Sequence, residues 1–166
     1  MAINESAMPV PLLGGCSCGD IRFAITSEPL ALYACHCTDC QRSSGTAFTM
    51  TMLIDRATFS VQKGEPAQYS ARLAVGKMAT GFMCGNCSTR LWRIGRKSVN
   101  LLALRAGTLD QTSWFRPVAH FWTRSAQPWV TFPKDSVLYE TQPLDGWQEV
   151  IRLSQSKNAP LEGNAP

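Results

Sequence analysis

Seven cysteines fall into three short groups, and their spacing restricts the fold more than any other feature of the chain. The groups are Cys16-x-Cys18, Cys35-x-Cys37-x-x-Cys40 and Cys84-x-x-Cys87. The first and last groups supply two thiols each, and together they complete the four-thiolate tetrahedron that structural zinc prefers. The middle group supplies three, one fewer than a closed site needs, and zinc sites with an open position are typically catalytic. The spacing therefore predicts one zinc ion that pins the fold and a second at which chemistry occurs.

Two other interpretations of the cysteines stay open. Free cysteine packs like a small hydrophobic residue, so ordinary buried thiols would need no metal. Disulfides are the second alternative, but an odd count leaves one thiol free, and Cys-x-Cys suits a framework of bridges poorly. The first residues lack a basic segment, and the apolar run over residues 10–13 is too short for a signal peptide. We therefore expect a cytoplasmic protein, because clustered cysteines in a reducing compartment usually bind metal or act in catalysis.

The composition indicates a compact domain with a small-molecule partner. With 166 residues, 45% of them hydrophobic and 17% charged, the chain can bury a core as one domain. The net charge is a modest +4 and the basic residues are scattered, so we expect no nucleic-acid partner. No stretch approaches the roughly 20 apolar residues of a membrane-spanning helix, so we expect no membrane partner.

Short alternating segments separated by turn residues predict a mainly β fold. We expect a flexible arm over residues 1–12, one domain over residues 13–150 and a polar tail over residues 151–166. Helical turns are expected only near residues 109–114 and 144–150. The predicted strands are residues 20–26, 31–34, 46–53, 58–62, 67–72, 77–83, 90–94, 99–106 and 118–123.

Four motifs follow one another between about residue 14 and residue 129. They are Gly14-Gly15-Cys16-Ser17-Cys18-Gly19, then Cys-His-Cys-x-x-Cys-x-x-Ser-Ser-Gly-x-x-Phe from Cys35, then Phe82-Met83-Cys84-Gly85-Asn86-Cys87, then Arg105-Ala106-Gly107-Thr108-Leu109-Asp110. Their order and spacing resemble the glutathione-dependent formaldehyde-activating enzyme family, which also includes centromere protein V. The resemblance implies a single-domain, Mss4-like fold of antiparallel sheets stapled by zinc.

The resemblance also implies a division of the ligands. The structural zinc would be held by Cys16, Cys18, Cys84 and Cys87, and the catalytic zinc by Cys35, Cys37 and Cys40. This agrees with the division that the spacing predicts. The residue after the last cysteine pair is Ser88, where many relatives have glycine, a change that affects a turn and no ligand.

The activity that the resemblance implies is that of a carbon–sulfur lyase or synthase. Such an enzyme joins glutathione, the co-substrate, to formaldehyde as S-hydroxymethylglutathione and cleaves the adduct again. An open zinc position would lower the pKa of the thiol or polarise the aldehyde oxygen. Candidate substrate contacts follow the middle cysteines: Arg42 for a glutathione carboxylate, and Ser43 or Ser44 for a backbone group. Residues 41–45 also have the composition of a plain polar loop, so a turn without a binding role stays open.

The two histidines are expected to have different roles. His36 lies between two expected ligands, so we expect its side chain to steady the loop through a hydrogen bond instead of binding metal. His120 lies on an apolar strand and is expected at the core or its rim.

Two further functions stay open beside the enzyme. A non-catalytic zinc-binding interaction module is the main alternative. A redox protein related to methionine sulfoxide reductases ranks last, because those proteins use two Cys-x-x-Cys pairs. The aromatic residues Trp129, Phe132 and Trp147 are candidates for covering a core edge or a second subunit, which leaves a homo-oligomer open.

Overall fold

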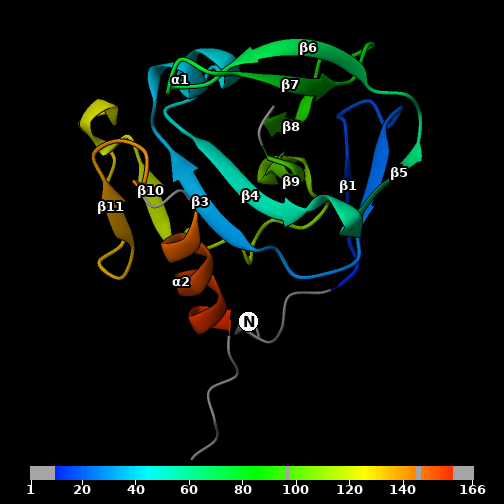
Figure 1. The fold of residues 1–166 in the computed structure, drawn as a ribbon. Helices are drawn as coiled ribbons and strands as arrows, with labels where there is room; N and C mark the ends of the chain where they lie inside the picture. Colours follow the sequence, from blue (N-terminus) through cyan, green and yellow to red (C-terminus); the bar gives the residue numbers. More distant parts are fainter. Residues whose placement is uncertain (1–9, 96–97, 145–146, 159–166) are drawn as a thin grey trace, which may run out of the picture.

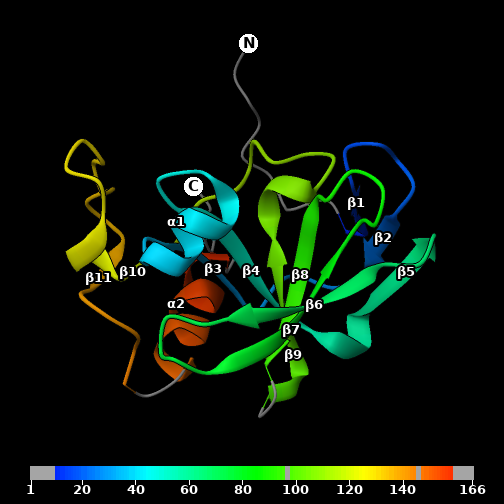
Figure 2. The same ribbon diagram turned by 90° about the horizontal axis from the view of Figure 1, so that it is seen from above.

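The fold is mainly β, as the sequence predicts, and is built from two sheets of unequal size. The computed structural model describes residues 10–95, 98–144 and 147–158. The smaller sheet has the strand order β1-β2-β5, and the larger has the order β11-β10-β3-β4-β9-β8-β7-β6. Figures 1 and 2 both place the smaller sheet at one end of the molecule and β10 with β11 at the other. No helix among the described residues is long and apolar enough to span a membrane.

The bounds of the elements follow the chain. The strands are β1 (Leu12–Gly15), β2 (Arg22–Ile25), β3 (Ala31–Cys35), β4 (Thr49–Asp55), β5 (Phe59–Lys63), β6 (Ala67–Arg72), β7 (Met78–Met83), β8 (Arg90–Gly95), β9 (Ser98–Arg105), β10 (Ala119–Phe121) and β11 (Val137–Tyr139). The helices are α1 (Thr38–Ser44) and α2 (Gln148–Asn158), with 3-10 turns η1 (Arg56–Thr58), η2 (Ala106–Thr108) and η3 (Thr123–Ser125).

The first core cluster joins the two sheets. Alternation along β2 directs Phe23 and Ile25 inward, where both are almost fully buried. They belong to one apolar cluster with Met52 of β4 and Leu104 of β9. Trp92 of β8 meets the edge of Phe23 with ring centroids 6.2 Å apart. Burial of these large side chains holds the smaller sheet against the larger one.

The second core cluster lies where α2 packs against β3 (Figure 1). Tyr33 of β3 stacks on Phe121 of β10 at 4.7 Å between ring centroids. Trp147 contacts both rings, and Val150 of α2 is fully buried. Successive residues of β3 join different clusters, Leu32 the first and Tyr33 the second, so every residue of this strand is buried.

One edge of the larger sheet differs from the antiparallel arrangement that the resemblance implies. β10 pairs in parallel with β3 on one side and with β11 on the other. The remaining strand pairs of both sheets are antiparallel. The long connection that parallel pairing requires is supplied by the chain between β3 and β10, which crosses most of the sheet before it returns.

Three local expectations are wrong. Residues 41–45, expected as a polar loop, belong largely to α1, and residues 109–114 are not helical. The polar tail predicted from residue 151 gives way to α2, which continues to Asn158 and buries Ser154. Of the predicted arm, residues 1–9 lie outside the described residues, and Leu12 is buried at the start of β1. Residues 159–166 of the predicted tail also lie outside the described part.

Candidate metal centres and an arginine-lined cleft

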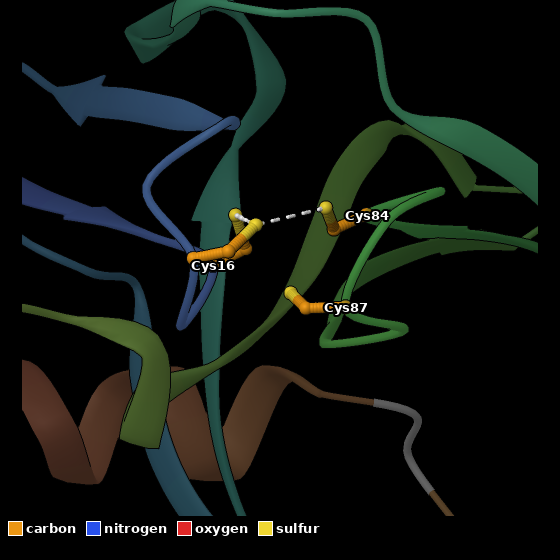
Figure 3. A group of neighbouring side chains, drawn as sticks. Cys16, Cys84 and Cys87 are labelled. Carbon is orange, nitrogen blue, oxygen red and sulfur yellow. Dashed lines mark hydrogen bonds between the residues drawn. The ribbon is translucent and has the colours of Figure 1, made fainter.

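Two turns from different sheets bring four cysteines together. Figure 3 labels three of them, Cys16, Cys84 and Cys87. Cys16 and Cys18 follow β1 of the smaller sheet, and Cys84 and Cys87 follow β7 of the larger one. All four sulfur atoms lie within 4.8 Å of one another. The Sγ atoms of Cys16 and Cys18 are 3.5 Å apart, and those of Cys18 and Cys84 are 3.6 Å apart. Tetrahedral zinc with Zn–S bonds of about 2.3 Å places its sulfurs about 3.8 Å apart, so this cluster fits zinc.

The two turns share one hydrogen-bond pattern. The amide of Cys16 donates to the carbonyl of Ile21 at 3.0 Å, and the amide of Cys84 donates to the carbonyl of Thr89 at 3.0 Å. Each turn contains one residue with positive φ, Gly19 at 77° and Ser88 at 59°. Ser88 thus occupies the left-handed region that favours glycine, which gives a physical reason for the glycine that the resemblance leads us to expect there.

Nearby donors stabilise negative charge on the sulfurs of this cluster. The hydroxyls of Ser17 and Thr89 lower the pKa of Cys87 to about 5. The amide of Ile21 donates to Cys16 Sγ at 3.2 Å. Because the thiolate is the form that binds metal, these contacts favour a bound cation.

The start of α1 brings the other three cysteines together. Cys35 ends β3, Cys37 is the residue that caps α1, and Cys40 lies in its first turn. Their sulfur atoms lie within 4.8 Å of one another, so they can hold a second metal ion through three ligands. The sulfur of Cys37 accepts a hydrogen bond from the amide of Cys40 at 3.2 Å. All three cysteines are buried, and the largest exposed fraction is 7%, at Cys35.

Negative charge in this cluster concentrates on Cys40. Hydrogen bonds from the Cys35 and Cys37 thiols hold the pKa of Cys40 far below its usual value. Arg93 of β8 adds a favourable positive charge. Burial acts to lower the pKa of Arg93, but the combined attraction of Cys40, Tyr33 and Cys35 raises it overall.

His36 and His120 form a buried pair. His36 Nε2 and His120 Nδ1 lie 3.0 Å apart, and the ring of Phe132 packs against both. Burial lowers the pKa of both histidines, that of His120 to about 4, so both are neutral at pH 7. His36 is not among the converging ligand atoms of the described residues, and its main chain accepts hydrogen bonds from Gln41 and Ser125.

A cleft of about 250 Å³ opens beside α1. It is lined by Asp39, Arg42, Ser43, Tyr69, Ser70, Ala71, Arg72, Arg90, Arg93 and Arg105. These residues come from α1 and from three strands at one end of the larger sheet, β6, β8 and β9. Arg90 lies over the ring of Tyr69, 5.2 Å from its centroid. The cleft therefore combines α1, which carries the candidate substrate contacts Arg42 and Ser43, with a wall of arginines.

Arg93 and Arg105 are half-buried, and both lie on the side of this wall that faces Cys40. Arg105 Nη2 donates to Ser43 Oγ at 3.2 Å. Burial lowers the pKa of Arg105, and repulsion from the neighbouring Arg93 lowers it further. Arg93 Nε and Arg105 Nη1 are buried and have no hydrogen-bond partner. Behind the surface of the wall, these two buried donors are thus left unsatisfied by the described residues.

The predicted substrate contacts are not all in the cleft. Arg42 and Ser43 line it, whereas Ser44 does not; the Ser44 hydroxyl donates to the carbonyl of Cys40 at 2.9 Å. Arg93 and Arg105 also belong to the site, although the sequence alone does not indicate them. Arg105 opens the motif Arg105-Ala106-Gly107-Thr108-Leu109-Asp110, but only its hydrogen bond to Ser43 shows that it faces α1.

The aromatic residues near the carboxyl end have different environments. Phe132 covers the histidine pair and Trp147 belongs to the second core cluster, so both cover a core edge as the sequence suggested. Trp129 is 71% exposed.

Comparisons with known proteins identify one family. Residues 11–125 match the family model described as "Glutathione-dependent formaldehyde-activating enzyme". No curated protein shows a significant match to the chain. Among solved structures, a crystal structure of a protein from Rhodobacter sphaeroides is 16% identical and has a TM-score of 0.48. That match covers 76% of this chain and 98% of the other.

Proposed function

The chain belongs to the glutathione-dependent formaldehyde-activating enzyme family, and on that basis we propose that it is a zinc-dependent carbon–sulfur lyase or synthase. Its substrates would be a glutathione-type thiol and a small aldehyde. One observation carries the proposal: three cysteine sulfurs converge at the start of α1, the helix that lines a cleft through Asp39, Arg42 and Ser43. Three ligands would leave the fourth position of a tetrahedral zinc site for a substrate. The four-cysteine cluster would hold a structural zinc.

The catalytic zinc would be held by Cys35, Cys37 and Cys40. When bound, it supplies a Lewis acid that lowers the pKa of the thiol or polarises the aldehyde oxygen. The chain's own residues orient the ligands: α1 begins at the cluster, and Arg93 offsets the charge on Cys40. In the synthase direction the thiol sulfur bonds to the carbonyl carbon, and the thiol proton ends on the former carbonyl oxygen. The lyase direction reverses both changes.

Metal content measured together with turnover tests this proposal. We expect two zinc ions per chain by elemental analysis. A mild chelator should remove one, abolish turnover of glutathione with formaldehyde, and leave the fold intact. Added zinc should restore the activity. A parallel blank without protein corrects for the spontaneous reaction of the thiol with the aldehyde. Two zinc ions that resist the chelator, with no turnover, would contradict the proposal.

The burial of the middle cysteines supports one alternative. Because no more than 7% of any of them is exposed, the site also suits a closed, non-catalytic zinc-binding module that binds a partner. That function predicts tight zinc at both sites and no turnover with any pair of thiol and aldehyde.

A further inference from the structure

Positive charge dominates the cleft beside α1. Five arginines line it together with one carboxylate, that of Asp39. Within the described part of the chain, no carboxylate lies within ion-pair distance of these arginines; the ion pair found there joins Arg22 to Asp110 instead. So much unpaired charge around a small concave surface attracts an anion.

Two of the arginines form an inner pair against the cysteine cluster. Arg93 on β8 pairs with Ala103 on β9, and Arg105 lies two residues further along β9, on the same face of the sheet. Arg93 Nε and Arg105 Nη1 are both buried donors that have no hydrogen-bond partner among the described residues. Guanidinium donors side by side suit the planar oxygens of a carboxylate.

The net negative charge of a zinc-loaded site would not neutralise both Arg93 and Arg105. Zinc contributes two positive charges and three thiolates contribute three negative ones, which leaves one net negative charge. The positive charge of Arg93, which is attracted to Cys40, would balance that charge. Arg105 then stays without a counter-charge, as do the exposed rim arginines Arg72 and Arg90.

From these positions we propose that the carbonyl substrate is itself an anion: an aldehyde with a carboxylate beside its carbonyl carbon, of the glyoxylate type, held by Arg105 and Arg93. The inference rests on the proposed function and specifies which class of small aldehyde is the substrate. A carboxylate on the inner pair lies close to Cys40, and therefore close to the reacting carbon. Formaldehyde has no charge for these arginines to bind. The carboxylates of glutathione are several bonds from its sulfur, so they would reach the exposed arginines at the rim of the cleft instead of the inner pair.

The reaction balances as a simple addition. The thiol sulfur bonds to the aldehyde carbon, the carbon–oxygen double bond becomes a single bond, and the thiol proton moves to that oxygen. The carboxylate keeps its charge throughout, so the arginines that bind it serve both directions of the reaction.

Steady-state kinetics of the zinc-loaded full chain test the proposal. With glutathione as the thiol, kcat/KM for glyoxylate should exceed that for formaldehyde by about ten-fold or more. Arg105→Gln should lower this ratio about ten-fold, mainly through KM for glyoxylate. Arg105→Lys should restore part of it, because lysine keeps the charge but not the planar fork. The matched control is Arg56→Gln, at an exposed arginine outside the cleft, which should leave the ratio unchanged.

A binding measurement gives a readout that does not depend on turnover. Oxamate, which has an amide in place of the aldehyde, should bind the wild-type chain saturably in a calorimetric titration. Arg105→Gln should weaken its binding about ten-fold, and Asp39→Asn, which removes the one carboxylate of the cleft, should strengthen it.

Three outcomes overturn the inference while leaving the proposed function intact. The first is turnover of formaldehyde as fast as glyoxylate with no saturable binding of oxamate. The second is an equal loss of kcat with both aldehydes in Arg105→Gln, because the arginine then stabilises charge that develops on the reacting oxygen. The third is a preference for glyoxylate over formaldehyde that disappears when 2-mercaptoethanol replaces glutathione, because the preference then depends on the thiol. Absence of turnover with both aldehydes is the different result that overturns the proposed function itself.

Discussion

At the residue scale, two equivalent turn positions differ in conformational cost. Gly19 and Ser88 both have positive φ, one in each turn of the four-cysteine cluster. A left-handed conformation costs a residue with a Cβ roughly 1–2 kcal/mol, and glycine avoids this at some cost in entropy. The turn after β7 therefore carries strain that the turn after β1 does not.

We expect Ser88→Gly to raise the free energy of unfolding by about 0.5–1 kcal/mol. Gly19→Ala is the matched opposite and should lower it by a similar amount. A Cβ at Gly19 would meet no atom within 4 Å, so that cost comes from the backbone alone. Urea unfolding of the zinc-loaded variants measures both changes. A Ser88→Gly variant less stable than wild type would show that the serine contributes a contact that outweighs its strain.

The ion pair between Arg22 and Asp110 links β2 to the segment after η2. Arg22 lowers the pKa of Asp110, so the folded-state value lies below the unfolded one. The contribution to stability is thus fully present above the unfolded pKa and is lost as pH falls through the folded pKa. Because the side chains are 35% and 45% exposed, solvent screening limits it to less than about 1 kcal/mol.

Asp110→Asn should therefore be slightly less stable than wild type at pH 7. The difference should persist down to about pH 5 and shrink below about pH 4. Unfolding curves of both proteins at matched pH values check this. A difference that grows on acidification would have the wrong sign for a carboxyl with a lowered pKa.

At the scale of elements, α1 has seven residues, and its N-terminal cap is also an expected metal ligand. Cys37 accepts the hydrogen bond from the amide of Cys40, which a serine hydroxyl accepts at least as well. One substitution at this position can therefore separate the metal site from the helix.

Cys37→Ser should abolish turnover and lower the zinc content by one ion, with a free energy of unfolding within about 1 kcal/mol of wild type. Cys37→Ala removes the cap as well and should cost roughly a further 1 kcal/mol. Activity, elemental analysis and urea unfolding give the three readouts. Unfolding of Cys37→Ser would mean that the three-cysteine site holds the fold together, against the proposed function.

Elements with a strong alternating pattern could be predicted, and weakly patterned ones could not. β6 matches its prediction residue for residue, and most other strands agree to within one or two residues. The sequence does not predict α1, because a helix with one buried residue, Cys40, has no apolar periodicity. The division of the cysteines needed only spacing. The inner arginine pair depends on the register of β8 and β9, and the parallel pairing of β10 depends on contacts across the whole sheet; neither has a local signal.

At the scale of the whole molecule, α2 completes the second core cluster. Val150 is fully buried there, in one cluster with Tyr33 and Phe121. Val150→Ala should lower the free energy of unfolding by about 2 kcal/mol, although alanine is the better helix former. Arg152→Ala, at an exposed position of the same helix, should change it by less than about 0.5 kcal/mol. Equal effects of the two changes in urea unfolding would mean that α2 does not pack as described.

The position of α2 in the chain also sets an order of events during synthesis. The buried residues of the first core cluster lie between Leu12 and Phe115, whereas those of the second extend to Val150. A ribosome releases the chain from its amino end, so the first cluster can close while the second still lacks its helix. Until α2 emerges, Tyr33 and Phe121 form an uncovered apolar surface. A nascent chain halted before residue 147 would present one finished core and one surface open to chaperones.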